Sequence, residues 1–297
     1  GIAVKYLKCG ESSTSGKIPL VFFVIPGNPG CIRFYEKFAD SLFSKTKIPV
    51  WGISHVGHSK LPSVDLTEKD KYQHPGREDC GLSRQIALKV DFLRDEVFPV
   101  AEKVILVGHS IGCYIILQIM SKLDGKLAEK VEKGVLLFPT IERMRLTPQG
   151  KKLTPMLANA RWLFWAVEYL IHKTDVPVAI ESYKPDLFSS EPSIIETVAD
   201  NIASHQVADS MTYMGLQEMY EVGLRCRKDD DLVSKFLSRL IFYYGASDKW
   251  CPYDFYEKMK LEFGSRPGAH IEVADQGIPH AFVLTHSHQV AEKVAGW

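Results

Sequence analysis

The sequence lacks several features that would indicate particular classes of function. It has no excess charge of either sign, since 36 Lys and Arg residues balance 36 Asp and Glu residues, so no overall field favours nucleic acid as a partner. Its six cysteines form no C-x-x-C pair, which predicts reduced thiols and no bound metal or other cofactor. No apolar run reaches the ~18 residues that a membrane-spanning helix needs.

The start of the chain also lacks the pattern of a signal peptide. Because the sequence begins at Gly1 rather than at a methionine, the question whether a targeting segment precedes it stays open. With 297 residues, 45% of them hydrophobic, the chain can form one large α/β domain with an insertion, or two domains.

The most specific signal is a serine between glycines after a short apolar run. Val104–Val107 is too short for a helix and too apolar for a surface strand, which predicts a buried central strand. It leads directly into GHSIG, the G-x-S-x-G pattern in which a sharp strand-to-helix turn exposes the serine hydroxyl. We therefore predict that Ser110 is a nucleophile. The alternative is a serine that only caps the following helix.

A glycine-rich loop after another apolar run predicts the site that stabilises an oxyanion. Ile18–Ile25 is typical of a buried strand, and the loop PGNPG follows it. Where a serine lies on such a strand-to-helix turn, a loop of this kind donates one backbone N–H to the oxyanion, and the residue after the serine donates another. The predicted donors are Ile111 and either Gly27 or Asn28. A plain Pro/Gly turn is the alternative.

The acid of a Ser-His-Asp triad is expected after a later apolar strand. Leu240–Tyr244 predicts that strand, and Asp248 follows it in GASDKWCP. A surface ion pair with Lys249 is the alternative role for Asp248. Weaker candidates for the acid are Asp254, Asp275 and Glu142.

The predicted base, His280, lies beyond the last predicted strand, His270–Val273. It belongs to a loop, GIPHAF, that opens the final helix, from which an imidazole can reach the serine hydroxyl. The other histidines near these motifs are interpreted as structural, packed or solvated: His55, His58, His286 and His288.

Strand and helix patterns alternate as far as Gly134–Pro139, which predicts a parallel sheet. The alternation then stops, because residues 140–235 show helical segments and no convincing strand. We predict a core made of residues 1–139 and 236–297, and a helical lid, residues 140–235, inserted over Ser110.

One segment of the predicted lid, Trp162–Ile171, is apolar on nearly all sides of a helix. Such a helix is buried in protein, buried in lipid or exposed as a docking patch. Its aromatic residues and the lysines that flank the segment suit a helix lying in a lipid monolayer. A lid helix that covers the acyl pocket is the alternative, and one helix can do both. The predicted lipid contacts are Trp162, Leu163, Phe164, Trp165 and Tyr169.

The order Ser110, Asp248, His280 is that of an α/β-hydrolase, with a mostly parallel central sheet, helices on both faces and a helical lid. Nearly the whole chain resembles the lipid droplet-associated hydrolase family. The motifs that carry this resemblance are Ile25–Gly30, Gly108–Gly112, Leu136–Met144, Phe242–Pro252 and Ile278–Phe282.

The resemblance implies a serine hydrolase of neutral-lipid or sterol esters on the cytosolic face of lipid droplets and the endoplasmic reticulum. Its partners would be a lipid ester and a lipid surface that it contacts without spanning. The motifs predict acyl transfer through an acyl-enzyme on Ser110. Two alternatives stay open: a lipid-surface binding protein with an idle triad, and an esterase or thioesterase with a soluble substrate.

Overall fold

The computed structural model describes residues 4–10, 16–60, 75–159, 192–198, 204–223 and 231–297. Its strands are β1 (Tyr6–Cys9), β2 (Ile18–Ile25), β3 (Val50–Ile53), β4 (Ala101–His109), β5 (Val131–Leu137), β6 (Leu240–Tyr244) and β7 (His270–Val273). Its α-helices are α1 (Glu36–Thr46), α2 (Leu82–Phe92), α3 (Ile111–Lys122), α4 (Gly125–Lys130), α5 (Pro148–Asn159), α8 (Pro192–Thr197), α9 (His205–Glu221), α10 (Leu232–Phe236), α11 (Tyr253–Phe263) and α12 (Ser287–Ala295).

The strands form a single sheet in the order β1-β3-β2-β4-β5-β6-β7. All neighbours are parallel except β1, which pairs antiparallel with β3 at the edge. The central strand β4 lies between β2 and β5. Val104, Leu106 and Val107 of β4 are almost completely buried, as expected for a parallel strand covered on both faces. This confirms the predicted mostly parallel α/β sheet.

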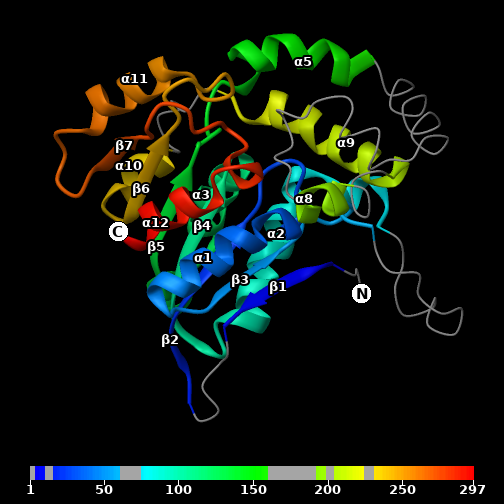
Figure 1. Ribbon diagram of the computed structural model, residues 1–297. Coiled ribbons are helices and arrows are strands. Elements are labelled where there is room, and N and C mark those ends of the chain that lie inside the picture. The colour runs from blue at the N-terminus through cyan, green and yellow to red at the C-terminus, as the bar shows by residue number, and fades with distance from the viewer. Residues whose placement is uncertain (1–3, 11–15, 61–74, 160–191, 199–203, 224–230) are drawn as a thin grey trace, which may run out of the picture.

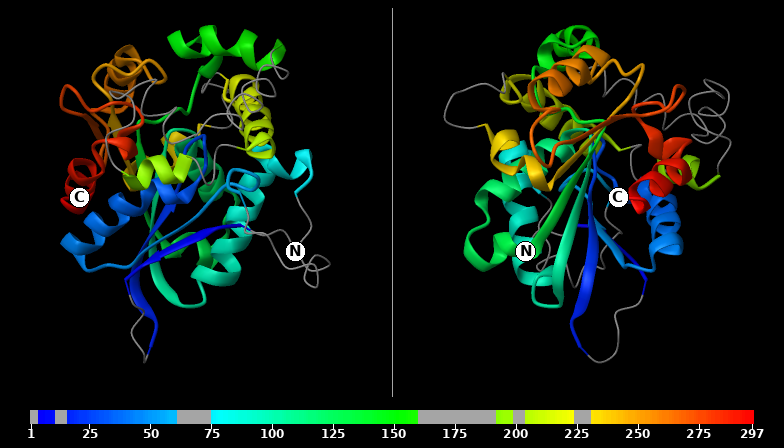
Figure 2. Two further views of the ribbon diagram at one scale, coloured as in Figure 1. Left: turned by 45° about the vertical axis from the view of Figure 1, so that its right-hand side comes forward. Right: turned by 90° about the vertical axis from the view of Figure 1, so that its left-hand side faces the viewer.

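Helices cover both faces of the sheet. Helices α1 and α12 pack together on one face, and α2 and α3 lie on the other (Figure 2). The parallel strands end at the same edge of the sheet, and helices α5 and α9 lie beyond that edge (Figure 1). Since α/β proteins place their sites at the carboxyl ends of parallel strands, these two helices lie on the functional side.

The strand predictions agree closely with the structure where a strand is a continuous apolar run. The predicted bounds of β2 and β6 are those observed, and so are those of β7, although β7 is short and contains two polar residues. Strand β5 begins at Val131, earlier than predicted, because it enters the sheet through the polar residues Glu132 and Lys133 before its apolar part begins. The short edge strand β1, Tyr6–Cys9, alternates exposed and half-buried residues and has no apolar run to mark it.

The described part of residues 140–235 consists of helices and connections, with no strand among those residues. Its division from the core as a lid stays a prediction. The segment Trp162–Ile171 and its predicted lipid contacts lie outside the described residues. Among the helices that the structure does describe, none combines the length and the apolar character required to cross a bilayer.

Candidate active site

Ser110 occupies a strained turn between β4 and α3. Its backbone has φ 56° and ψ −122°, which a residue with a side chain adopts only where the surrounding structure enforces it. A Cβ at Gly108 would lie 2.7 Å from the backbone of Gly112, and a Cβ at Gly112 would lie 2.2 Å from the Ile25 carbonyl oxygen. Both glycines are therefore required by close packing, as the G-x-S-x-G pattern predicts.

The structure brings Ser110, His280 and Asp248 together. Ser110 Oγ lies 2.9 Å from His280 Nε2, and His280 Nδ1 lies 2.5 Å from Asp248 Oδ2. The three residues are far apart in the chain and meet because β4, β6 and β7 end at the same edge of the sheet. A proton can pass from the hydroxyl to the ring, while the carboxylate orients the ring and stabilises its positive charge.

The Asp248 carboxylate is held as an anion by four hydrogen bonds. Besides His280, its donors are the N–H of Trp250 (2.7 Å) and both the N–H (3.2 Å) and the thiol (3.0 Å) of Cys251. Its side chain is 1% exposed. Burial acts to raise the pKa of Asp248, but the charge of His280 and these hydrogen bonds outweigh burial, so the pKa lies below its usual value.

The competing candidates for the acid are engaged elsewhere. Asp248 does not form the alternative surface ion pair with Lys249, since its side chain is buried against His280. Asp254 pairs with Lys258 at 3.0 Å, and Glu142 pairs with Arg143 at 3.1 Å.

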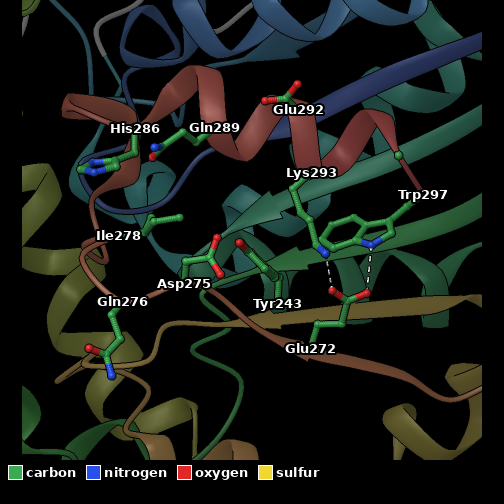
Figure 3. Close-up of a pocket in the computed structure, with 11 residues that line it drawn as sticks. Tyr243, Glu272, Asp275, Gln276, Ile278, His286, Gln289, Glu292, Lys293 and Trp297 are labelled. Atoms are coloured by element: carbon green, nitrogen blue, oxygen red, sulfur yellow. Dashed lines mark hydrogen bonds and ion pairs between the residues drawn. The ribbon is translucent and has the colours of Figure 1, made fainter.

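The remaining candidate acid, Asp275, lines a surface cavity of about 610 Å³ near β7 and α12. Figure 3 shows Glu272 in this cavity between Lys293 (2.6 Å) and the indole N–H of Trp297 (3.2 Å). The residues that line it include none of the triad. These contacts tie α12 to the edge strand β7, and the cavity is separate from Ser110.

The structure bears on the choice between Gly27 and Asn28 as the second oxyanion donor. The Gly27 N–H donates to Tyr35 Oη at 2.8 Å, so it is already committed and cannot also bind an oxyanion. Within the described part of the chain, the backbone N–H groups of Asn28 and Ile111 have no hydrogen-bond partner. Gly27 instead provides space, since a Cβ there would lie 3.1 Å from Ser110 Cβ.

A hydrogen-bonded chain that the sequence does not reveal runs behind the serine. His109 Nε2 lies 2.8 Å from the His280 carbonyl oxygen, which can only accept, so Nε2 carries the proton. His109 Nδ1 therefore accepts from Tyr35 O–H at 2.7 Å. Burial lowers the pKa of His109 to about 3, with the charge of His280 acting in the same direction. A neutral imidazole thus links the Gly27 loop to the backbone of the histidine loop.

Of the residues that sequence reasoning missed, Cys251 and His109 lie inside motifs already identified, three residues after Asp248 and next to Ser110. Tyr35 gives no such signal, because it belongs to an apolar stretch that is typical of an ordinary core. Its role depends on contacts between segments that are distant in the chain.

His55 and His58 have structural positions, in agreement with their interpretation. Both are buried, and burial holds the pKa of each well below its usual value, to about 3 for His58. His58 Nδ1 accepts the N–H of Gly30 at 3.0 Å, which fixes the far end of the PGNPG loop. His286 bonds to the neighbouring Thr285, and His288 lies near Ser41.

The described cysteines are free thiols: Cys9, Cys31, Cys80, Cys113 and Cys251. Among the described residues, one group has the spacing of metal ligands, with atoms of Asp248, Cys251 and His280 within 4.8 Å of one another. In that group Asp248 Oδ2 accepts hydrogen bonds from both of the other residues, so these hydrogen bonds account for the close spacing.

Comparison with known proteins agrees with this fold and shows the family. A sequence model of the family described as Lipid-droplet associated hydrolase matches residues 19–283. The chain belongs to the lipid droplet-associated hydrolase family. It is 39% identical to the lipid droplet-associated hydrolase of Mus musculus, over 100% of this chain and 92% of that protein. Identity to that of Homo sapiens is 36%, over 99% and 91% of the two chains.

A comparison with solved structures supports the fold independently of the family. The lipase-esterase related protein from Clostridium acetobutylicum ATCC 824 superposes with a TM-score of 0.62 over 99% of this chain and 98% of that one, at 14% identity. At that identity the likeness shows the fold alone, which is that of the α/β-hydrolases. The family and the fold together support hydrolase activity.

Proposed function

We propose that this protein is a serine esterase that cleaves carboxylic esters of neutral lipids, either sterol esters or acylglycerols. The observation that carries the proposal is the continuous hydrogen-bonded series from Ser110 Oγ through His280 to Asp248. This series activates a hydroxyl that is otherwise a weak nucleophile. The family name adds the lipid droplet as the setting.

The mechanism is acyl transfer in two steps. His280 Nε2 takes the proton of Ser110 as Oγ attacks the ester carbonyl, and Asp248 stabilises the imidazolium. The backbone N–H groups of Asn28 and Ile111 bind the oxyanion, each contributing about 3 kcal/mol. His280 then protonates the leaving alcohol. Water, deprotonated by the same ring, hydrolyses the acyl-enzyme and regenerates Ser110.

The proposed site of action is the cytosolic face of lipid droplets and the endoplasmic reticulum. The contact with lipid is peripheral and involves the aromatic residues of Trp162–Ile171. In this arrangement the segment 140–235 is a lid, and its contact with lipid brings the ester to Ser110.

The test compares hydrolysis of emulsified sterol ester, emulsified triacylglycerol and a soluble short-chain p-nitrophenyl ester. Wild type is compared with Ser110→Ala and with the control Ser121→Ala, which changes a serine near the other end of α3. We expect Ser110→Ala to lower turnover of an emulsified ester on the order of 10⁶-fold, with Ser121→Ala close to wild type.

Two results would contradict the proposed substrate class. Turnover of the soluble ester alone would indicate a soluble-ester esterase or thioesterase. Droplet binding by wild type without Ser110-dependent turnover of any ester would indicate a lipid-surface binding protein with an idle triad.

A further inference from the structure

The side chain of Asn28 ties the PGNPG loop to helix α9. Its amide Nδ2 donates to the carbonyl oxygen of Met211 at 2.9 Å and to Glu218 Oε1 at 2.9 Å. An amide nitrogen carries two protons, so both are used on one helix that lies more than 180 residues later in the chain. The residue proposed to offer its backbone N–H to the oxyanion is thus anchored by its side chain to the 140–235 segment.

Helix α9 is shaped to receive this amide. Met211, Gly215 and Glu218 are spaced by four and three residues, so they share one face of the helix. A Cβ at Gly215 would lie 3.3 Å from Asn28 Nδ2, which is closer than an ordinary contact. A glycine inside a helix costs stability relative to alanine, and here it lets the amide lie directly against the helix.

Glu218 is an unusual residue for this position. It is only 4% exposed, and among the described residues Asn28 is the one hydrogen-bond partner of its carboxyl group. Burial raises the pKa of Glu218 to about 8, opposed only in part by the hydrogen bond from Asn28. No Lys or Arg among the described residues pairs with Glu218, and a buried acid without a cation destabilises a fold compared with an apolar residue. Packing alone therefore does not account for Glu218.

The two ends of the loop are held by side chains that come from outside α9. The Gly27 N–H is fixed by Tyr35, and the Gly30 N–H is fixed by His58. Between these two points, the direction of the Asn28 peptide depends on where its side chain is held. Glu218 is the residue of α9 whose side chain accepts a hydrogen bond from the Asn28 amide and so holds it.

We propose that Glu218 is a positioning residue for the reaction: through the Asn28 amide it sets the direction of the Asn28 backbone N–H toward the oxyanion. Helix α9, part of the segment predicted as a lid, thereby becomes a component of the catalytic apparatus. The inference rests on the proposed esterase function and assigns a role to a residue outside the triad and the oxyanion hole.

Other contacts hold α9 against the core, so Glu218 can be replaced without detaching the helix. The Leu82 N–H donates to Gln217 Oε1 at 2.6 Å, and Arg77 pairs with Asp209 at 3.6 Å. These contacts keep α9 on the core when the contact of Glu218 is removed. Gln217→Leu is the matched control, because it removes a hydrogen bond between α9 and the core that does not involve Asn28.

The experiment measures kcat and KM for a soluble p-nitrophenyl ester, together with Tm, for wild type, Glu218→Leu, Glu218→Gln and Gln217→Leu. Removing one oxyanion donor costs roughly 100- to 1,000-fold in kcat, and a misdirected donor loses part of that. We expect Glu218→Leu to lower kcat by about 10- to 100-fold with KM changed less than about 3-fold. Glu218→Gln keeps an acceptor oxygen and should remain within about 3-fold of wild type, as should Gln217→Leu.

The outcomes separate this inference from the proposed function. If wild type turns over the ester and Glu218→Leu has the same kcat, the positioning role is wrong and the esterase function stands. The role is equally wrong if Glu218→Gln loses as much kcat as Glu218→Leu, or if kcat in all three variants simply follows Tm. If wild type hydrolyses no ester and does not react with a fluorophosphonate, the proposed function fails and the inference fails with it.

Discussion

At the scale of single residues, the candidate site is held together by polar contacts behind the serine. Tyr35 accepts from the Gly27 N–H and donates to His109, which in turn donates to the backbone of His280. The loop beside the serine and the loop that carries the base are therefore joined through buried, neutral groups. Such networks stabilise a structure only when every member has its partner.

Replacing Tyr35 with phenylalanine tests this network. The change leaves the Gly27 N–H and His109 Nδ1 buried without a partner, and a buried unpaired group costs about 1–3 kcal/mol. Because two groups lose their partner, we expect Tyr35→Phe to lower the free energy of unfolding by at least that amount in urea denaturation. The control Tyr253→Phe, at a residue 44% exposed, should change it by less than about 0.5 kcal/mol. Equal stability of Tyr35→Phe and wild type would show that the network contributes nothing.

Ser110 and Asp248 could be picked out because each follows an apolar strand, and His280 because it lies in a loop after the last strand. The choice between Gly27 and Asn28 as the second oxyanion donor could not be made from the sequence, for the opposite reason. The group that occupies the Gly27 N–H, Tyr35, lies in the next helical stretch, and nothing in the sequence says that the two meet. The pairing of Asn28 with Glu218 joins segments still further apart.

At the scale of elements, hydrophobic runs predicted the central strands because parallel strands are buried on both faces. Ile241 and Phe242 of β6 illustrate this, since both are almost completely buried. Polar residues at a strand entrance, such as Glu132 and Lys133, conceal where a strand begins. The register between strands depends on backbone pairing and has no signature in a single sequence.

The segment Trp162–Ile171 carries a prediction at this scale. If its aromatic residues contact lipid, the double variant Trp162→Ser and Trp165→Ser should float with artificial lipid droplets at least about 5-fold less than wild type, since buried aromatic area drives interfacial binding. Tyr6→Ser removes an exposed aromatic residue from the edge strand β1 and should float normally. Unchanged flotation of the tryptophan variant would exclude this segment as the anchor.

At the scale of the whole molecule, stability should depend on pH through Glu218. Its pKa is about 8 in the folded protein and 4.5 ordinarily, so the folded state binds the proton more tightly. The resulting stability is complete below the ordinary pKa and is lost as pH rises from there through about 8, by at most about 1.4 kcal/mol per pH unit.

The Tm of wild type should therefore fall more steeply than that of Glu218→Gln between about pH 5 and about pH 8. Thermal unfolding of both proteins at several pH values in that range measures the difference. Parallel curves for the two proteins would contradict a protonated, buried Glu218.

The whole fold serves to bring three distant residues to one edge of a parallel sheet, and the account stands or falls on whether Ser110 reacts. The most direct measurement is labelling with a fluorophosphonate probe, for wild type and Ser110→Ala, in detergent and with artificial lipid droplets. If Ser110 is the nucleophile, the probe labels wild type, labelling is abolished in Ser110→Ala, and droplets increase it. Absence of labelling of the wild-type protein in both conditions would contradict this role of Ser110.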